Sequence, residues 1–76
     1  MINIENNLFK IRKEMKISQH KLAKNVGISR PYLSRIENGH VKPSTEISYK
    51  IARSLGKTIE DIFFNSDVNH NLRKGQ

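Results

Sequence analysis

Residues 19–36 read QHKLAKNVGISRPYLSRI, and this stretch holds the pattern that decides the fold. Ala23 and Gly27 stand four residues apart in it. Two short helices that cross at about 90 to 120 degrees need a small residue at their crossing and a turn residue that accepts a positive φ. Ala23 and Gly27 meet these two needs. The sequence therefore predicts a helix-turn-helix unit, in which the angle between the helices is filled by Leu22, Val26, Ile28, Leu33 and Ile36.

Capping residues divide the rest of the chain into further short helices. Ser18, Ser29 and Ser44 can each accept a hydrogen bond at a helix N-terminus, and Gly27 and Gly56 can end two of these helices. No stretch alternates with a period of two, so we expect an all-α fold, a compact five-helix domain. The other predicted boundaries are a first helix over about 7–15, a third helix that ends at Asn38, and a fifth that opens with Thr58 and Asp61 as a variant capping box.

The apolar faces of these helices define one domain, which we expect to span residues 1–64. Leu8, Ile11 and Met15 recur at helical spacing in the first helix. Residues 65–76 contain two hydrophobic residues in twelve, and we expect them to form a polar, flexible C-terminal tail. The inward positions predicted for the fourth and fifth helices are Ile47, Ile51, Ala52, Leu55, Ile59, Ile62 and Phe63.

Length and charge narrow the class of function. A chain of 76 residues buries only about 60% of its unfolded surface and has little room for a catalytic cleft, so an enzyme is not expected. The net charge of +7 attracts polyanions such as nucleic acid. The sequence has no cysteine and no run close to the roughly 18 apolar residues of a membrane span. We therefore expect a soluble cytoplasmic protein without a membrane partner.

Metal and cofactor chemistry find little support in the sequence. His20, His40 and His70 are too widely spaced for a local metal motif, and no cysteine joins them. The four glycines lie far apart, so they form no phosphate-binding loop. We expect no metal and no cofactor.

Three segments together resemble a known family. They are SQHKLAKNVGIS at residues 18–29, YLSRIENGHVKPS at 32–44 and IARSLGKTIEDIF at 51–63. In this order and spacing they are similar to the Cro/cI-type helix-turn-helix family, also called XRE, and the resemblance covers about residues 8–64. It implies a five-helix, lambda-repressor-like domain that binds operator DNA as a dimer and regulates transcription.

The third helix, about Ser29 to Asn38, is the predicted recognition helix in the major groove. With Leu33 and Ile36 inward, Arg30 and Arg35 lie on its flank and its outer side, where an arginine can bond O6 and N7 of a guanine. The resemblance likewise implies base contacts at Arg30, Pro31 and Arg35, although a proline offers only apolar contact, such as with a thymine methyl group. The alternative is that both arginines merely solvate an exposed face. The candidate base readers are Arg30, Pro31, Tyr32, Ser34 and Arg35.

Phosphate contacts are expected beside this helix. The N-terminus of the second helix has free amides near Gln19, and such a terminus favours an anion. In the loop after the third helix, Lys42 is a stronger candidate than His40, because an ordinary histidine is mostly uncharged at pH 7. The alternative for each residue is an ordinary surface position. The candidates are Gln19, Ser29, Asn38, His40, Lys42 and Arg12.

Arg12 and Glu37 are predicted to form an ion pair. Both are charged residues on faces that turn inward, and an isolated buried charge is costly. The resemblance implies the same pair, which could also direct Arg12 toward the DNA backbone. The alternative is two independent, solvated charges.

The last helix is the predicted dimer interface. Ile59, Ile62, Phe63 and Phe64 supply more apolar surface than one short helix buries internally, although Phe64 could equally be a core residue. We expect a repressor that binds a palindromic operator as a homodimer, while activation from an upstream site stays open. The competing hypothesis is an antitoxin-like protein that masks another, unknown protein and binds DNA secondarily.

Overall fold

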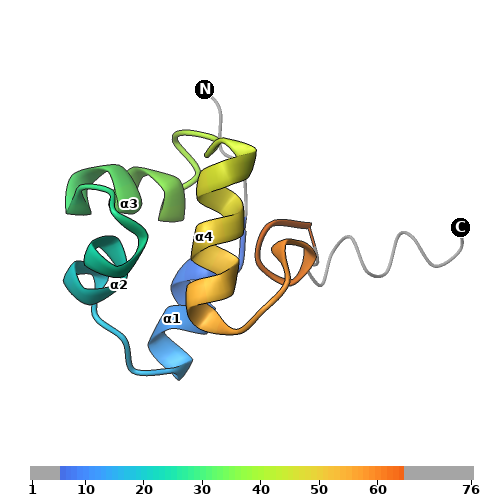
Figure 1. The fold of residues 1–76 in the computed structure, drawn as a ribbon, viewed down its shortest axis with the longest axis horizontal. Coiled ribbons are helices and arrows are strands. Elements are labelled where there is room, and N and C mark those ends of the chain that lie inside the picture. Colours follow the sequence, from blue (N-terminus) through green and yellow to red (C-terminus); the bar gives the residue numbers. More distant parts are fainter. Residues whose placement is uncertain (1–5, 65–76) are drawn as a thin grey trace, which may run out of the picture.

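The computed structural model describes residues 6–64, which form four α-helices and a final π-helical turn, with no strand in this range. The predicted all-α fold is confirmed. In Figure 1, α4 stands in the middle of the molecule, with α2 and α3 on one side and the last turn on the other. Residues 65–76, for which we predicted a tail, lie outside the described residues. The elements are α1 (Leu8–Glu14), α2 (Gln19–Val26), α3 (Arg30–Glu37), α4 (Thr45–Leu55) and η1 (Glu60–Phe64).

Serine hydroxyls cap three of the helices, as the sequence predicts. Ser18, Ser29 and Ser44 precede α2, α3 and α4. Each serine Oγ accepts a hydrogen bond from the backbone N–H three residues later, over 3.0, 3.2 and 3.1 Å respectively. A cap of this kind is worth about 1 kcal/mol to the helix that follows it. The residue at which each of these helices begins is therefore set by its own serine cap.

Glycines end α2 and α4 in the left-handed region, with φ of 86° at Gly27 and 69° at Gly56. The end of α3 differs slightly from the prediction. Gly39 takes the positive φ, 75°, whereas Asn38 stays at −87°. As a result α3 ends at Glu37, one residue earlier than expected.

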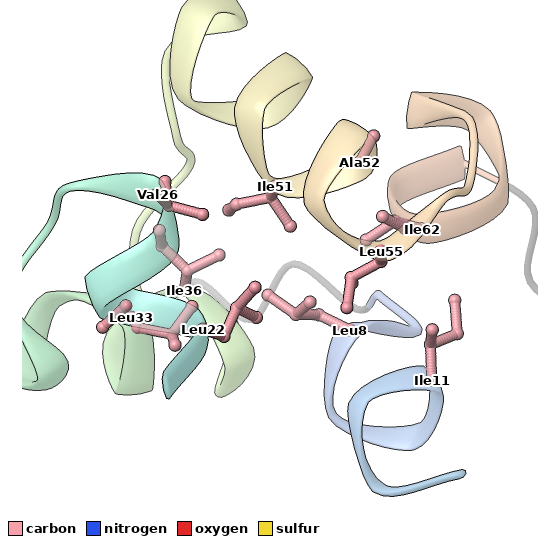
Figure 2. Packing of buried hydrophobic residues seen from close by; sticks show 11 residues of the cluster. Leu8, Ile11, Leu22, Val26, Leu33, Ile36, Ile51, Ala52, Leu55 and Ile62 are labelled. Atoms are coloured by element: carbon pink, nitrogen blue, oxygen red, sulfur yellow. The ribbon is translucent and has the colours of Figure 1, made fainter. Parts of the chain in front are cut away.

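One hydrophobic core joins all five elements. Figure 2 shows Leu8 of α1 between side chains of α2 and α4, with Ile62 of η1 beside Leu55. Each fully buried leucine or isoleucine contributes roughly 1.5 to 3 kcal/mol relative to exposure. The large side chains that are completely enclosed are Leu8, Leu22, Leu33, Ile36, Ile51 and Ile62.

The predicted inward position of Met15 is wrong, because α1 ends at Glu14 and Met15 is 43% exposed. Lys16 then takes a left-handed φ of 60° and turns the chain toward α2. The inward side of α1 is completed instead by Arg12, which is buried.

The final element, η1, is a π-helical turn that begins two residues after Thr58. Thr58 and Asp61 form the predicted reciprocal cap, in which each backbone N–H donates to the other side chain, over 3.1 and 3.0 Å. The carbonyl oxygens of Asp61 and Ile62 accept hydrogen bonds from the side-chain and backbone nitrogens of Asn7, over 3.0 and 2.7 Å. Terminal carbonyl groups of a helical turn need such partners. Asn7, just before α1, therefore holds η1 in place.

Candidate nucleic-acid interface

The turn between α2 and α3 has the geometry predicted from its small residues. Ala23 is 3% exposed, and its carbonyl oxygen accepts hydrogen bonds from the backbone N–H groups of Gly27 and Ile28, over 2.8 and 3.0 Å. A Cβ atom added at Gly27 would meet nothing within 4 Å, so the turn needs glycine for its backbone angles and not for space. Because α3 starts three residues after Gly27, the turn presents the first residues of α3 at the surface.

The outward side of α3 carries the candidate base readers. Arg30, Pro31 and Arg35 are exposed, and Pro31 lies in the first turn, where a missing N–H costs no intrahelical hydrogen bond. Tyr32 and Ser34 are half-buried, and Tyr32 packs against the core. The opposite side of the helix is closed by Leu33 and Ile36 (Figure 2).

The candidate phosphate contacts surround α3. His40 and Lys42 are exposed in the loop that leads to α4, and a backbone hydrogen bond of 2.9 Å from His40 to the carbonyl of Arg35 folds this loop against the helix end. Asn38 is exposed and donates to the Ser34 hydroxyl over 3.4 Å. Ser29 is exposed and uses its hydroxyl oxygen as the cap of α3.

Arg12 and Glu37 form the expected ion pair inside the protein. Arg12 Nε lies 2.6 Å from Glu37 Oε2, and the two side chains are 7% and 3% exposed. The other Arg12 nitrogens donate to Glu37 Oε1 and to the carbonyl of Ile17, over 3.2 and 2.8 Å. The Phe9 ring lies 5.4 Å from the Arg12 guanidinium carbon. This enclosure favours the structural role of Arg12 over contact with a phosphate.

Gln19 has a place that sequence reasoning missed. Its Nε2 donates to Glu37 Oε1 over 3.0 Å, while its Oε1 accepts a hydrogen bond of 3.2 Å from Arg30 Nε. The sequence suggests Gln19 only as a phosphate contact. The position of these residues in the helices could have revealed that Gln19 bridges Glu37 and Arg30. Gln19 and Arg30 are the first residues of α2 and α3, and Glu37 is the last residue of α3.

The family model for helix-turn-helix proteins matches residues 8–62. The chain is a member of the XRE helix-turn-helix family. An uncharacterised helix-turn-helix transcriptional regulator of Methanothermobacter thermautotrophicus is 43% identical over 53 residues, which make up 68% of this chain and 77% of the relative. The resemblance to Cro/cI-type regulators is thus confirmed.

Solved structures of regulators share the fold. The clp gene regulator ClgR from Corynebacterium glutamicum superposes with a TM-score of 0.75 at 25% identity, covering 91% of this chain and 73% of ClgR. The restriction-modification controller protein C.AhdI from Aeromonas hydrophila gives 0.69 at 27% identity, covering 72% and 83%. The protein is therefore an XRE-family transcriptional regulator that binds DNA, and its family consists of regulators and not of enzymes.

The predicted dimer interface of this XRE-family regulator needs one correction. Ile62 is fully buried, because it points from η1 into the core beside Leu55 (Figure 2), and it offers no surface to a partner. Phe64 is 59% exposed, and Ile59 and Phe63 are half-buried. These three residues border a groove of about 310 Å³, whose other apolar wall is Val41 and Pro43 in the loop before α4.

The described part of this XRE-family chain has neither a membrane-spanning helix nor a metal-binding cluster. Residues 6–64 include no helix long and apolar enough to cross a bilayer. In the same range, no three histidine or acidic side chains come together in an arrangement that could hold a metal ion.

Proposed function

We propose that this XRE-family regulator represses transcription by binding a palindromic operator as a homodimer, with α3 in the major groove of each half-site. The observation that carries the proposal is the division of α3 into two sides. Leu33 and Ile36 close one side onto the core, whereas Arg30 and Arg35 stand exposed on the remaining surface. A bound dimer would block polymerase by occupying the promoter in the cytoplasm.

Base readout is assigned to the exposed side of α3. Arg30 and Arg35 bond guanine edges, each good bidentate contact being worth about 1 to 3 kcal/mol of discrimination. Pro31 offers an apolar contact with a thymine methyl group, and Tyr32 and Ser34 flank these readers at half-buried positions.

Phosphate contacts are assigned to the exposed groups around α3. They position the protein on the duplex without reading its sequence. Lys42 supplies the main charge, with Asn38, His40 and Ser29 beside it.

The homodimer interface is assigned to η1 and the groove beside it. The exposed ring of Phe64 and the apolar walls of the groove would be covered by a second copy. Figure 1 shows η1 on the side of α4 away from α2 and α3, so an interface there leaves α3 open. Dimeric helix-turn-helix proteins read half-sites about 34 Å apart, which places two such helices in successive major grooves.

Selection of bound duplexes from a random library tests the proposed function. The selected duplex and a scrambled duplex are then titrated at two salt concentrations. We expect a symmetric consensus that is bound at least about 10³ times more tightly than the scrambled duplex. Equal, salt-sensitive binding to both duplexes would contradict sequence-specific repression and direct attention to a protein partner.

A further inference from the structure

A line of four side chains connects the buried ion pair to the recognition helix. Arg12 donates to Glu37, Glu37 accepts from Gln19, and Gln19 in turn accepts from Arg30. Exposure rises along this line, from the enclosed Arg12 and Glu37 through the half-buried Gln19 to the exposed Arg30. A residue on the surface that faces DNA is thus tied to the interior of the domain.

The donor and acceptor groups of these side chains allow only one direction for the hydrogen bonds along this line. An ionised carboxylate only accepts hydrogen bonds, and a guanidinium only donates them. Gln19 must therefore turn its amide NH₂ toward Glu37 and its carbonyl oxygen toward Arg30. The reverse orientation would place oxygen against carboxylate and NH₂ against guanidinium. The neighbours at both ends therefore hold the amide in one orientation.

This contact determines which edge of Arg30 remains available. Gln19 engages Nε of the guanidinium, and the two Nη groups at the far end make no hydrogen bond with residues 6–64, which leaves them available to a ligand. A guanine presents two acceptors, O6 and N7, that match a pair of parallel N–H donors. Arg35 provides a contrast, because its side chain makes no hydrogen bond or ion pair with residues 6–64.

We propose that Glu37 and Gln19 are positioning residues that hold Arg30 as an end-on reader of one guanine in each half-site. This inference rests on the proposed function, since it requires sequence-specific binding of DNA. Holding a flexible side chain in its bound conformation lowers the entropic cost of binding. The lower entropic cost strengthens binding only where Arg30 meets the base that it fits. The effect therefore appears as sequence preference at a single position.

The test variant is Gln19→Met, which keeps the length of the side chain and removes both hydrogen bonds. His20→Met, at an exposed position next to it on α2, is the matched control. The guanine is located as the operator position at which Arg30→Ala abolishes the preference. Affinities for the operator and for single-base variants at each position are then compared for all these proteins.

We expect Gln19→Met to lower the preference for that guanine roughly two- to tenfold, with preference at the position read by Arg35 unchanged. In an Arg30→Ala background the same change should have no further effect on preference. The double variant Arg12→Met with Glu37→Met, which removes the buried charges together, should show the same selective loss. His20→Met should leave every preference as in the unmodified protein.

A second measurement needs no DNA. In the free protein, the Arg30 Nε–H should exchange with solvent more slowly than the Arg35 Nε–H in NMR spectra. Gln19→Met should bring the two exchange rates together. Equal rates in the unmodified protein would overturn the inference.

The DNA experiment separates the two proposals. If the unmodified protein shows no sequence preference, the proposed function and this inference both fail. If it prefers one operator but Gln19→Met weakens all duplexes equally, the inference alone is overturned, and Gln19 is then a phosphate contact.

Discussion

At the scale of single residues, the proposed interface combines groups assigned to base reading with groups assigned only to positioning the protein. Arg35 is exposed on the outer side of α3, and Lys42 is exposed in the following loop. We expect Arg35→Ala to relax the preference at one base position in each half-site. Lys42→Ala should weaken binding to all sequences alike and lower the slope of log affinity against log salt by about one. Titrations of operator and random duplexes at several salt concentrations measure both effects, and equal losses on both duplexes from Arg35→Ala would remove Arg35 from the base readers.

The buried ion pair makes a separate prediction about stability. Glu37→Ala leaves the enclosed Arg12 charge without its partner, and we expect it to lower the free energy of unfolding by about 3 kcal/mol. Replacing Arg12 and Glu37 together by methionine should recover most of this loss, since no charge then stays buried. Urea unfolding of the three proteins measures the difference. A double variant as unstable as Glu37→Ala would show that the pair itself, and not the unpaired charge, sets the stability.

At the scale of elements, the α2–α3 turn depends on a backbone conformation. Gly27 has a φ of 86° with open space around it, so Gly27→Ala meets no steric obstacle. We expect this substitution to lower the free energy of unfolding by about 1 kcal/mol through the left-handed backbone alone. Gly27→Asn should cost less, because asparagine tolerates this region better than alanine does. A loss from Gly27→Asn as large as that from Gly27→Ala, in thermal or urea unfolding, would contradict a purely conformational role.

Local signals explain which parts of the elements could be predicted from the sequence. The helix caps are Ser18, Ser29 and Ser44, and each accepts a hydrogen bond from the residue three positions later. Both partners of such a cap are therefore close together in the sequence. The same holds for the Thr58 and Asp61 cap.

What could not be predicted has one local cause and one cause that lies in contacts distant in sequence. Met15 has helical spacing from Leu8 and Ile11, yet the left-handed Lys16 ends α1 before it. Gln19 bonds residues 18 and 11 positions away, so its bridge exists only once α2 and α3 have packed together. The Arg12 and Glu37 pair was predictable because a buried charge demands a partner, wherever the partner lies in the chain.

At the scale of the whole molecule, the groove beside η1 determines the expected assembly. Phe64→Ser should shift the protein toward the monomer in sedimentation experiments without unfolding it, because the side chain is 59% exposed. It should also weaken binding to a full palindrome more than binding to a half-site. Tyr49→Ser is the matched control, since Tyr49 is 53% exposed on α4, outside this groove. Equal effects of the two substitutions on sedimentation would place the interface elsewhere.

The bonds from Asn7 to η1 also concern the time at which the protein becomes active during its synthesis. The start of α1 is held by carbonyl groups of Asp61 and Ile62, and Leu8 is enclosed in a core that includes Ile62. A nascent chain that has emerged only through α4 already contains the whole of α3, but the start of α1 still lacks the carbonyl groups that bind Asn7 and the side chain of Ile62 in the core. We expect α1 to pack less firmly in such an unfinished chain. The complete core would form only in chains whose synthesis has passed η1.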